Sequence, residues 1–231
     1  MLEQAIASLK DYDWGKDKAV LQPIEEAVVA THGNAEDRKK LETSLAAVLT
    51  TDVPFDAKQY VCRKLMVIGT AESVPSLADL LTDEKLAHSA RYALERIDAP
   101  EAAQALRDAL AKTNGALKIG VISSLGARGD APSVAPLGAL LGDSDGAVAR
   151  AAAIALGAIR SPEAAKVLGA AKATDQTKSV IADAQLACAE NLLATGKKAQ
   201  AKVIYMGLLG KKPASHVKLA ATRGLLACAG Q

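Results

Sequence analysis

The 231-residue sequence has few aromatic residues, because Phe, Trp and Tyr together make up only 3% of it. Half of the residues are nevertheless hydrophobic, so the core must be filled by Ala, Leu, Val and Ile. Such side chains allow helices to pack at short distances. The composition therefore predicts a folded, helical protein. It excludes a disordered chain, which would have few hydrophobic residues and a large excess of one charge.

Cysteine is scarce as well, with three residues far apart in the chain: Cys62, Cys188 and Cys228. An odd number of scattered cysteines is a poor basis for a disulfide framework, and we interpret them as small buried hydrophobic residues. No apolar run approaches the length of about eighteen residues that a membrane helix needs, and the N-terminus is too charged for a secretory signal. We expect a soluble, cytoplasmic protein without membrane insertion, or alternatively an exported or periplasmic domain whose signal peptide has been removed.

Acidic residues are absent after Glu190. The same stretch contains seven basic residues: Lys197, Lys198, Lys202, Lys211, Lys212, Lys218 and Arg223. Such a patch either is a solvated face or neutralises the phosphates of a nucleic acid. Because Tyr205 is the only aromatic residue there, the pattern favours a solvated face and argues against a nucleic-acid partner.

Patterns for catalysis and metal binding are missing too. The three histidines lie in separate parts of the chain, without partners at metal-ligand spacing: His32, His88 and His216. Neither a nucleophile elbow nor a dinucleotide loop is found. The acids of "GDSDG", residues 142–146, lack the later ligands of a calcium loop, so we interpret Asp143 and Asp145 as turn and capping residues. We predict no catalytic residue, no metal site and no cofactor.

What the sequence does have is a repeat. Four similar segments share a leucine at a matching position, in steps of 29, 31 and 31 residues: Leu77, Leu106, Leu137 and Leu168. Each segment combines two apolar stripes with the three-and-four spacing of one helical face. The second stripe has a leucine column of its own: Leu65, Leu94, Leu125 and Leu156. Each repeat is therefore predicted to be a pair of antiparallel helices whose leucine columns form the core.

The segment "LGAIRSPEAAKVL", residues 156–168, indicates how one helix pair joins the next. Gly157, like Gly126 in the preceding repeat, has no side chain and lets neighbouring backbones approach closely. Ser161 can cap the following helix, and Pro162 suits its first turn. Helix pairs of this kind cannot bury their apolar faces alone, so they stack into a solenoid.

We therefore predict an all-α fold, an α-solenoid of about six stacked antiparallel helix pairs. Earlier helices are expected at residues 2–10, 18–31, 35–50 and 55–68, with Trp14 attaching the N-terminal part to the first hairpin. Three regions are predicted: a helical cap at 1–34, repeats at 35–175 and further helical repeats at 176–231. The last helix lacks the polar cap that solenoid ends need, which favours a fused domain beyond Gln231.

The repeats carry a resemblance to a known family. Residues 144–171, "SDGAVARAAAIALGAIRSPEAAKVLGAA", resemble a HEAT repeat of the PBS-lyase (bilin lyase) type, with its acidic turn, Val-x-Arg-x-x-Ala-x-x-Ala-Leu-Gly pattern and turn with Pro. Residues 55–171 resemble this armadillo-like family in series, although Glu95 and Asp98 stand where small residues are usual. Residues 187–213 resemble a tetratricopeptide repeat (TPR). The resemblance implies protein binding along a curved surface, with bilin attachment or isomerisation in one branch.

In HEAT stacks the second helices normally line the concave side, which identifies six candidates for partner binding: Gln59, Arg63, His88, Tyr92, Ser123 and Arg150. An exposed aromatic residue beside Arg and His is typical of an interface. The alternative is structural, with Tyr92 packed on a neighbouring unit and Arg150 paired with a turn acid such as Asp145.

The predicted function is that of a non-catalytic scaffold that binds a protein partner of unknown identity, alone or as one domain of a larger bacterial protein. Two alternatives stay open. One is a bilin-lyase-like protein that handles tetrapyrroles, and the other is nucleic-acid binding through the basic C-terminal helices.

Overall fold

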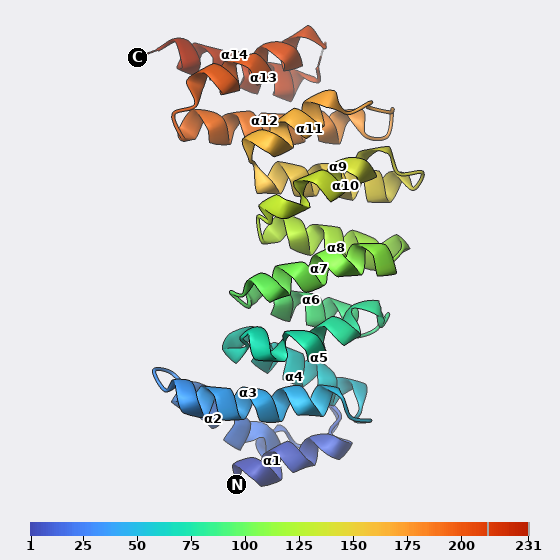
Figure 1. Ribbon diagram of the computed structural model, residues 1–231, viewed down its shortest axis with the longest axis vertical. Helices are drawn as coiled ribbons and strands as arrows, with labels where there is room; N and C mark the ends of the chain where they lie inside the picture. Colours follow the sequence, from blue (N-terminus) through green and yellow to red (C-terminus); the bar gives the residue numbers. More distant parts are fainter. Residues whose placement is uncertain (212, 231) are drawn as a thin grey trace. The chain divides into compact units, whose positions relative to one another are not determined.

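The structure is a computed structural model that describes residues 1–211 and 213–230. These residues form helices, turns and loops, and no strand occurs among them. The chain divides into two compact units, unit 1 with residues 1–113 and unit 2 with residues 114–231, coloured blue to green and green to red in Figure 1. Each unit is a stack of antiparallel helix pairs, so the predicted all-α solenoid fold is confirmed. The predicted regions 1–34, 35–175 and 176–231 remain a prediction.

Unit 1, in which every residue is described, has seven α-helices: α1 (Leu2–Ser8), α2 (Gln22–Ala30), α3 (Ala35–Leu49), α4 (Phe55–Ile68), α5 (Val74–Ala78), α6 (Ala87–Arg96) and α7 (Pro100–Lys112). Four short 3₁₀ helices, η1 (Leu9–Asp11), η2 (Lys18–Leu21), η3 (Ala71–Ser73) and η4 (Asp79–Thr82), extend α1, α2 and both ends of α5. Helices α3, α5 and α7 pack in one layer, and α4 and α6 pack in the other. The helices predicted before residue 70 are therefore confirmed, with 3₁₀ turns at the ends that such turns often occupy.

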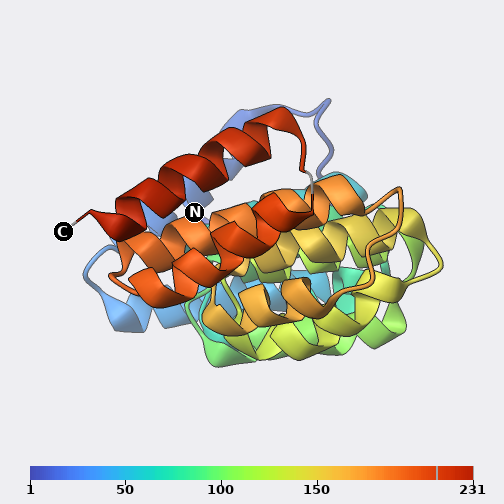
Figure 2. The ribbon, with the colours of Figure 1, turned by 90° about the horizontal axis from the view of Figure 1, so that it is seen from above.

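The described residues of unit 2 form seven further α-helices: α8 (Gly115–Ala127), α9 (Val134–Ala139), α10 (Gly146–Ile159), α11 (Pro162–Ala170), α12 (Lys178–Ala194), α13 (Lys198–Gly210) and α14 (Ser215–Ala229). One layer consists of α8, α10, α12 and α14, and the other of α9, α11 and α13. Figure 2 shows α12, α13 and α14 side by side. The same two-layer arrangement therefore occurs within each unit.

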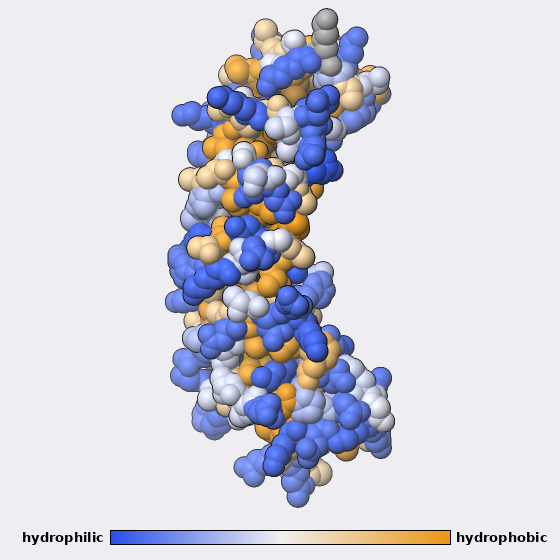
Figure 3. Space-filling view, turned by 90° about the vertical axis from the view of Figure 1, so that its right-hand side faces the viewer, coloured by the Kyte–Doolittle hydropathy of each residue, from blue (hydrophilic) through white to orange (hydrophobic). Residues whose placement is uncertain are grey.

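The two leucine columns lie in the core. All eight leucines have no exposed surface: Leu65, Leu77, Leu94 and Leu106 in unit 1, and Leu125, Leu137, Leu156 and Leu168 in unit 2. On the face shown in Figure 3, hydrophobic surface is visible between projecting hydrophilic side chains. The helical periodicity thus identified the buried face of each helix correctly.

Small residues set the distance between neighbouring helices of unit 2. A Cβ atom at Gly126 in α8 would lie 2.8 Å from the Cα of Ala155 in α10. A Cβ atom at Gly157 in α10 would lie 2.8 Å from the Cβ of Ala184 in α12. Because carbon atoms do not approach so closely, a methyl group at either glycine would force the helices apart. The predicted role of both glycines is confirmed.

The turns of unit 2 are capped as predicted. The Ser161 hydroxyl accepts a hydrogen bond from the Ala164 N–H at 3.0 Å, at the start of α11. The Asp145 carboxylate accepts one from the Ala147 N–H at 2.8 Å, at the start of α10, and Asp143 accepts one from the Asp145 N–H at 2.9 Å. These side chains replace the intrahelical partners that the first N–H groups of a helix lack.

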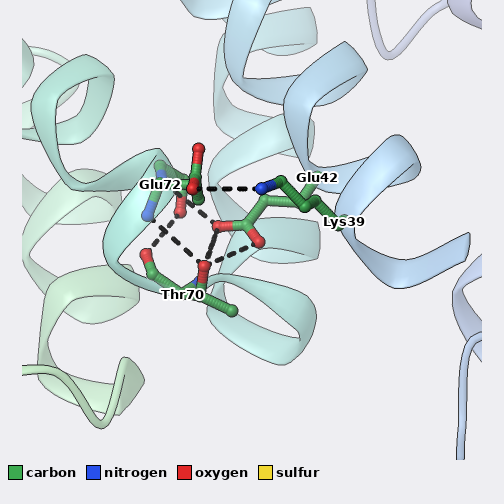
Figure 4. A network of polar contacts seen from close by, with 5 residues as sticks. Lys39, Glu42, Thr70 and Glu72 are labelled. Carbon is green, nitrogen blue, oxygen red and sulfur yellow. Dashed lines mark hydrogen bonds and ion pairs between the residues drawn. The ribbon is translucent and has the colours of Figure 1, made fainter. Parts of the chain in front are cut away.

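A buried carboxylate in unit 1 joins α3 to the segment that follows α4 (Figure 4). Glu42 of α3 is 1% exposed, and its carboxylate accepts hydrogen bonds from the N–H groups of Thr70 at 2.6 Å and Ser73 at 3.2 Å and from the Thr70 hydroxyl at 2.9 Å. Beside it, Lys39 and Glu72 form an exposed ion pair at 3.5 Å. Charge-assisted bonds of this kind are the stronger hydrogen bonds of a protein, so Glu42 holds the segment after α4 in place.

Arg38 completes this attachment of α3. Its Nε donates to the Ile68 carbonyl at 2.7 Å, and Nη2 donates to the Gly69 carbonyl at 3.4 Å. The cation therefore lies at the C-terminal end of α4, while Glu42, one turn further along α3, lies at the N–H groups that precede α5. Each charge has the sign that the nearby helix dipole favours.

Candidate protein-binding surface

The predicted contact residues of α4 pair with each other and with the N-terminal segment. Nη2 of Arg63 donates to Oε1 of Gln59 at 2.8 Å, and the Arg63 guanidinium lies 4.6 Å from the centroid of the Trp14 ring. The backbone N–H of Trp14 donates a hydrogen bond to a carboxylate oxygen of Asp56 in α4 at 3.1 Å. Trp14 thus attaches the N-terminal segment to α4, as predicted. Arg63 and Trp14 also form a cation–π pair that stays in contact with solvent, because Trp14 is 36% exposed.

A polar cluster next to this pair was not predicted from the sequence. Tyr12 is 1% exposed and its ring meets the Trp14 ring edge-to-face. The Tyr60 hydroxyl donates to one carboxylate oxygen of Glu25 at 2.8 Å, and Nζ of Lys64 donates to the other at 2.6 Å. No local sequence pattern predicts these contacts, because α2 and α4 are far apart in the sequence.

The cluster shifts the pKa values of two of its members. Burial, followed by the hydrogen bond to the Glu25 carboxylate, raises the pKa of Tyr60. Burial alone would also raise the pKa of Glu25, but the hydrogen bonds from Lys64 and Tyr60 and the charge of Lys64 outweigh it, so that the pKa is lowered. Glu25 is therefore an ion-paired carboxylate at neutral pH.

His88 and Tyr92 lie one turn apart on α6. Their rings meet edge-to-face with 4.5 Å between centroids, and Nη2 of Arg91 lies 3.2 Å from Nδ1 of His88. Tyr92 is 48% exposed, so about half of its side chain is left uncovered by the surrounding helices. The pair presents an aromatic surface to solvent with a cation beside it.

The structure brings Ser123 and Arg150 together. Both line an open groove of about 500 Å³ between α8 and α10, the α8–α10 groove, whose other main lining residues are Ile119, Ala147, Ala151, Ile154 and Gln176. Nη1 of Arg150 donates to the Gln176 carbonyl at 2.9 Å. The alternative partner for Arg150, the turn acid Asp145, is therefore wrong, because Arg150 instead ties the segment before α12 to α10.

The α8–α10 groove combines apolar and cationic surface. Ile154, one turn after Arg150, is 57% exposed, and Ile119 is half-buried on the opposite helix. Exposed apolar side chains around an Arg are the combination found at the energetic centre of protein interfaces. Ile154 was not among the predicted contacts, because within an alanine-rich helix it does not stand out from the core residues.

The predicted basic patch does not form one uniform surface. Lys197 lies near Glu163, whose pKa is lowered by a backbone hydrogen bond, by the Ser161 hydroxyl and by the charge of Lys197. Nζ of Lys198 donates to the Gly230 carbonyl at 2.9 Å.

The remaining basic residues differ in their surroundings. Lys211 lines a cavity beside α13, and it is exposed like the other described residues of the patch: Lys197, Lys198, Lys202, Lys218 and Arg223. Lys212 lies outside the described residues. The part of the patch that the structure describes is therefore exposed throughout, although Lys198 also bonds a backbone carbonyl and Lys211 also lines a cavity.

The cysteines behave as small core residues in two of three cases. Cys62 and Cys188 are buried, and burial raises the pKa of Cys62 to about 12 and that of Cys188 to about 11. Cys228 is half-buried. Across residues 1–211 and 213–230, no three His, Cys, Asp or Glu side chains gather as metal ligands. No helix in the described part of the chain is both long and apolar enough to span a bilayer.

Comparison with known proteins agrees with the helix-pair geometry. Residues 109–189 match the family model of HEAT repeats. This segment comprises α8 to α11 and most of α12, and it includes the whole α8–α10 groove. The HEAT-like prediction is confirmed for these residues. The PBS-lyase subtype and the tetratricopeptide resemblance remain predictions.

Two similar solved structures are engineered proteins from the Northeast Structural Genomics Consortium. The first is 21% identical with a TM-score of 0.46, and the alignment covers 99% of this chain and 68% of that one. The second is 21% identical with a TM-score of 0.40, covering 98% and 96%. TM-scores this low support no conclusion about function. The search of curated proteins found no match.

Proposed function

We propose that this protein is a non-catalytic scaffold that binds another protein through the second helices of its repeats. The observation that supports this most directly is the α8–α10 groove, where the exposed Ile154 lies one turn from Arg150. Stacked HEAT repeats form extended surfaces of this kind. The matching HEAT segment, which contains the groove, supports the same function.

Unit 1 has candidate contact residues of its own. Tyr92 with His88 on α6, and Arg63 with Gln59 on α4, present exposed aromatic and cationic groups. Aromatic residues and Arg are enriched at the centres of interfaces because they bury large areas and still form hydrogen bonds. No described feature favours tetrapyrrole or nucleic-acid binding over this function.

The experiment uses the full chain as bait with chemical cross-linking in a cell extract, followed by affinity measurement with the purified partner. Ile154→Asp should weaken binding by about 30-fold, because a carboxylate would be desolvated against an apolar contact. Leu226→Asp in α14 is the matched control, since Leu226 is equally apolar, 70% exposed and lines neither the α8–α10 groove nor the cavity beside α13.

Tyr92→Ala tests the surface of unit 1. It should weaken the same complex by about fivefold while leaving the unfolding midpoint unchanged, because Tyr92 is half exposed. The proposal is wrong if partners bind Ile154→Asp and Tyr92→Ala as tightly as the wild type. It is also wrong if Leu226→Asp weakens binding to the same extent as Ile154→Asp.

A further inference from the structure

A second groove lies in the other helical layer of unit 2. It has a volume of about 580 Å³ and lies between α11 and α13, which contact each other sparsely, with α12 as its floor. We call it the α11–α13 groove. Its apolar lining includes Leu192, Val203, Ile204 and Leu208, and Val203 is 71% exposed. It shares no lining residue with the α8–α10 groove.

Gln185 of α12 forms the polar floor of the α11–α13 groove. Its side chain also lines a smaller adjoining cavity of about 250 Å³. Gln185 is only 5% exposed, yet no residue in the described part of the chain hydrogen-bonds its amide. The N and O atoms of this amide are not fully buried, so water reaches them through the groove and a ligand group can replace that water. The amide can donate and accept hydrogen bonds, so it is suited to a polar group that enters the groove.

A glycine keeps this amide accessible. A Cβ atom at Gly169 in α11 would lie 3.8 Å from Nε2 of Gln185. A larger side chain at this position would extend over the amide without colliding with the backbone. Gly169 therefore leaves room above Gln185 for a group from another molecule.

The charges of the α11–α13 groove are all of one sign. Lys166 and Lys211 are its charged lining residues, and no acidic side chain lines it. Unit 2 as a whole has fourteen Lys and Arg but only seven Asp and Glu. Complementary charge steers association and selects partners, so the occupant should carry carboxylates beside its apolar side chains.

We propose that the α11–α13 groove binds an acidic amphipathic segment of a partner protein. The apolar side chains of the segment pack against Val203, Ile204 and Leu208, as an amphipathic helix does in a hydrophobic groove. Its carboxylates lie near Lys166 and Lys211, and one of its polar groups pairs with the Gln185 amide. This surface is additional to the one proposed above and does not depend on it.

The test selects binders from a phage-displayed library of random peptides of about 16 residues, which are about 24 Å long as helices. The full chain is the target. Recovered peptides should be rich in Asp and Glu, with apolar residues at helical spacing. Lys166→Glu combined with Lys211→Glu should weaken their binding by about tenfold, because attraction at two exposed positions becomes repulsion.

Two variants make the result specific. Lys202→Glu combined with Lys218→Glu changes the net charge of unit 2 equally at exposed positions outside the groove, and should leave binding unchanged. Gly169→Leu should block the groove and abolish binding, while the helix stays folded because Leu has a higher helix propensity than Gly.

The remaining outcomes overturn the proposal. The selection could recover no peptides, or only neutral or basic ones. The peptides could also bind the Lys166→Glu, Lys211→Glu variant or the Gly169→Leu variant as tightly as the wild type. Finally, the Lys202→Glu, Lys218→Glu control could weaken binding as much as the groove variant with Lys166→Glu and Lys211→Glu. Vesicles containing phosphatidylserine should not compete with the peptides, and competition would identify a membrane as the occupant instead. Ile154→Asp should leave peptide binding intact, which separates this result from that of the proposed function.

Discussion

Unit 1 contains five of the six aromatic residues and three of the seventeen glycines, whereas unit 2 contains one aromatic residue and fourteen glycines. Both units nevertheless stack antiparallel helices in two layers. Unit 1 fills the space between helices with rings and polar bridges, such as the contact of Tyr60 with Glu25. In unit 2 the helices instead lie closer together, because Gly126 and Gly157 pack against alanines. One helical architecture therefore tolerates two different ways of packing.

The two units also differ in their charged residues. Unit 1 has fourteen Lys and Arg against nineteen Asp and Glu, and unit 2 has fourteen against seven. Two acids of unit 1, Glu25 and Glu42, hold helices together. Unit 2 has fewer acids, and Lys166 and Lys211 line a groove that has no acidic residue among its described lining residues. Polar side chains of unit 1 therefore join its helices to one another, whereas more of those in unit 2 are free to contact a partner.

The largest effect is expected at the buried carboxylate of unit 1. Glu42→Ala should destabilise unit 1 by about 3 kcal/mol, because the N–H and hydroxyl of Thr70 lose their charged acceptor and the Ser73 N–H keeps only its bond to the Thr70 carbonyl. Trp14 is the only tryptophan and lies in unit 1, so its fluorescence during urea unfolding measures this loss. Glu72→Gln, at an exposed neighbour, should change stability by less than about 0.5 kcal/mol. A small loss for Glu42→Ala would show that unit 1 does not depend on this polar bridge.

A smaller loss is expected from a single methyl group in unit 2. Gly157→Ala should destabilise unit 2 by about 2 kcal/mol, because the new Cβ would overlap Ala184. Gly207→Ala in α13 is the matched control, since nothing lies within 4 Å of its added Cβ, and it should stabilise the protein by about 0.5–1 kcal/mol. Urea unfolding followed by circular dichroism measures both. Equal effects of the two substitutions would contradict close backbone packing as the basis of unit 2.

The smallest effect is expected at the Glu25 ion pair. Because the folded pKa of Glu25 lies below its ordinary value of 4.5, its contribution to stability is fully present above about pH 4.5 and is lost as the pH falls through the folded pKa. Glu25→Gln should therefore cost about 0.5–1 kcal/mol at pH 7, a value reduced by the partial exposure of the pair.

The pH dependence provides the check on this pair. Trp14 fluorescence during urea unfolding at several pH values should show the wild type and Glu25→Gln converging below about pH 4. Lys40→Gln, at an exposed pair with Glu36 on α3, should have almost no effect at any pH. A difference between Glu25→Gln and the wild type that persists unchanged to pH 3 would mean that the carboxylate charge does not stabilise unit 1.

Local sequence patterns predicted much of the fold and part of the site. The leucine columns, the cap at Ser161 and the close approach at Gly157 all follow from residues within one helix pair. The repeat pattern also placed Ser123 and Arg150 in related positions on second helices, and the structure puts both in one groove. The Gln176 carbonyl that binds Arg150 was not predicted, because a backbone acceptor leaves no mark on the sequence.

The sequence alone determined that the chain forms paired amphipathic helices with leucine-filled cores, since periodicity decides which face of each helix leaves water. Only the tertiary structure decided how those helices are held together. It placed Glu42 against Thr70 and Lys64 against Glu25, and it put Gln185 at the bottom of a groove. Such contacts join residues that are far apart in the chain, and their energies depend on distances that no local pattern encodes.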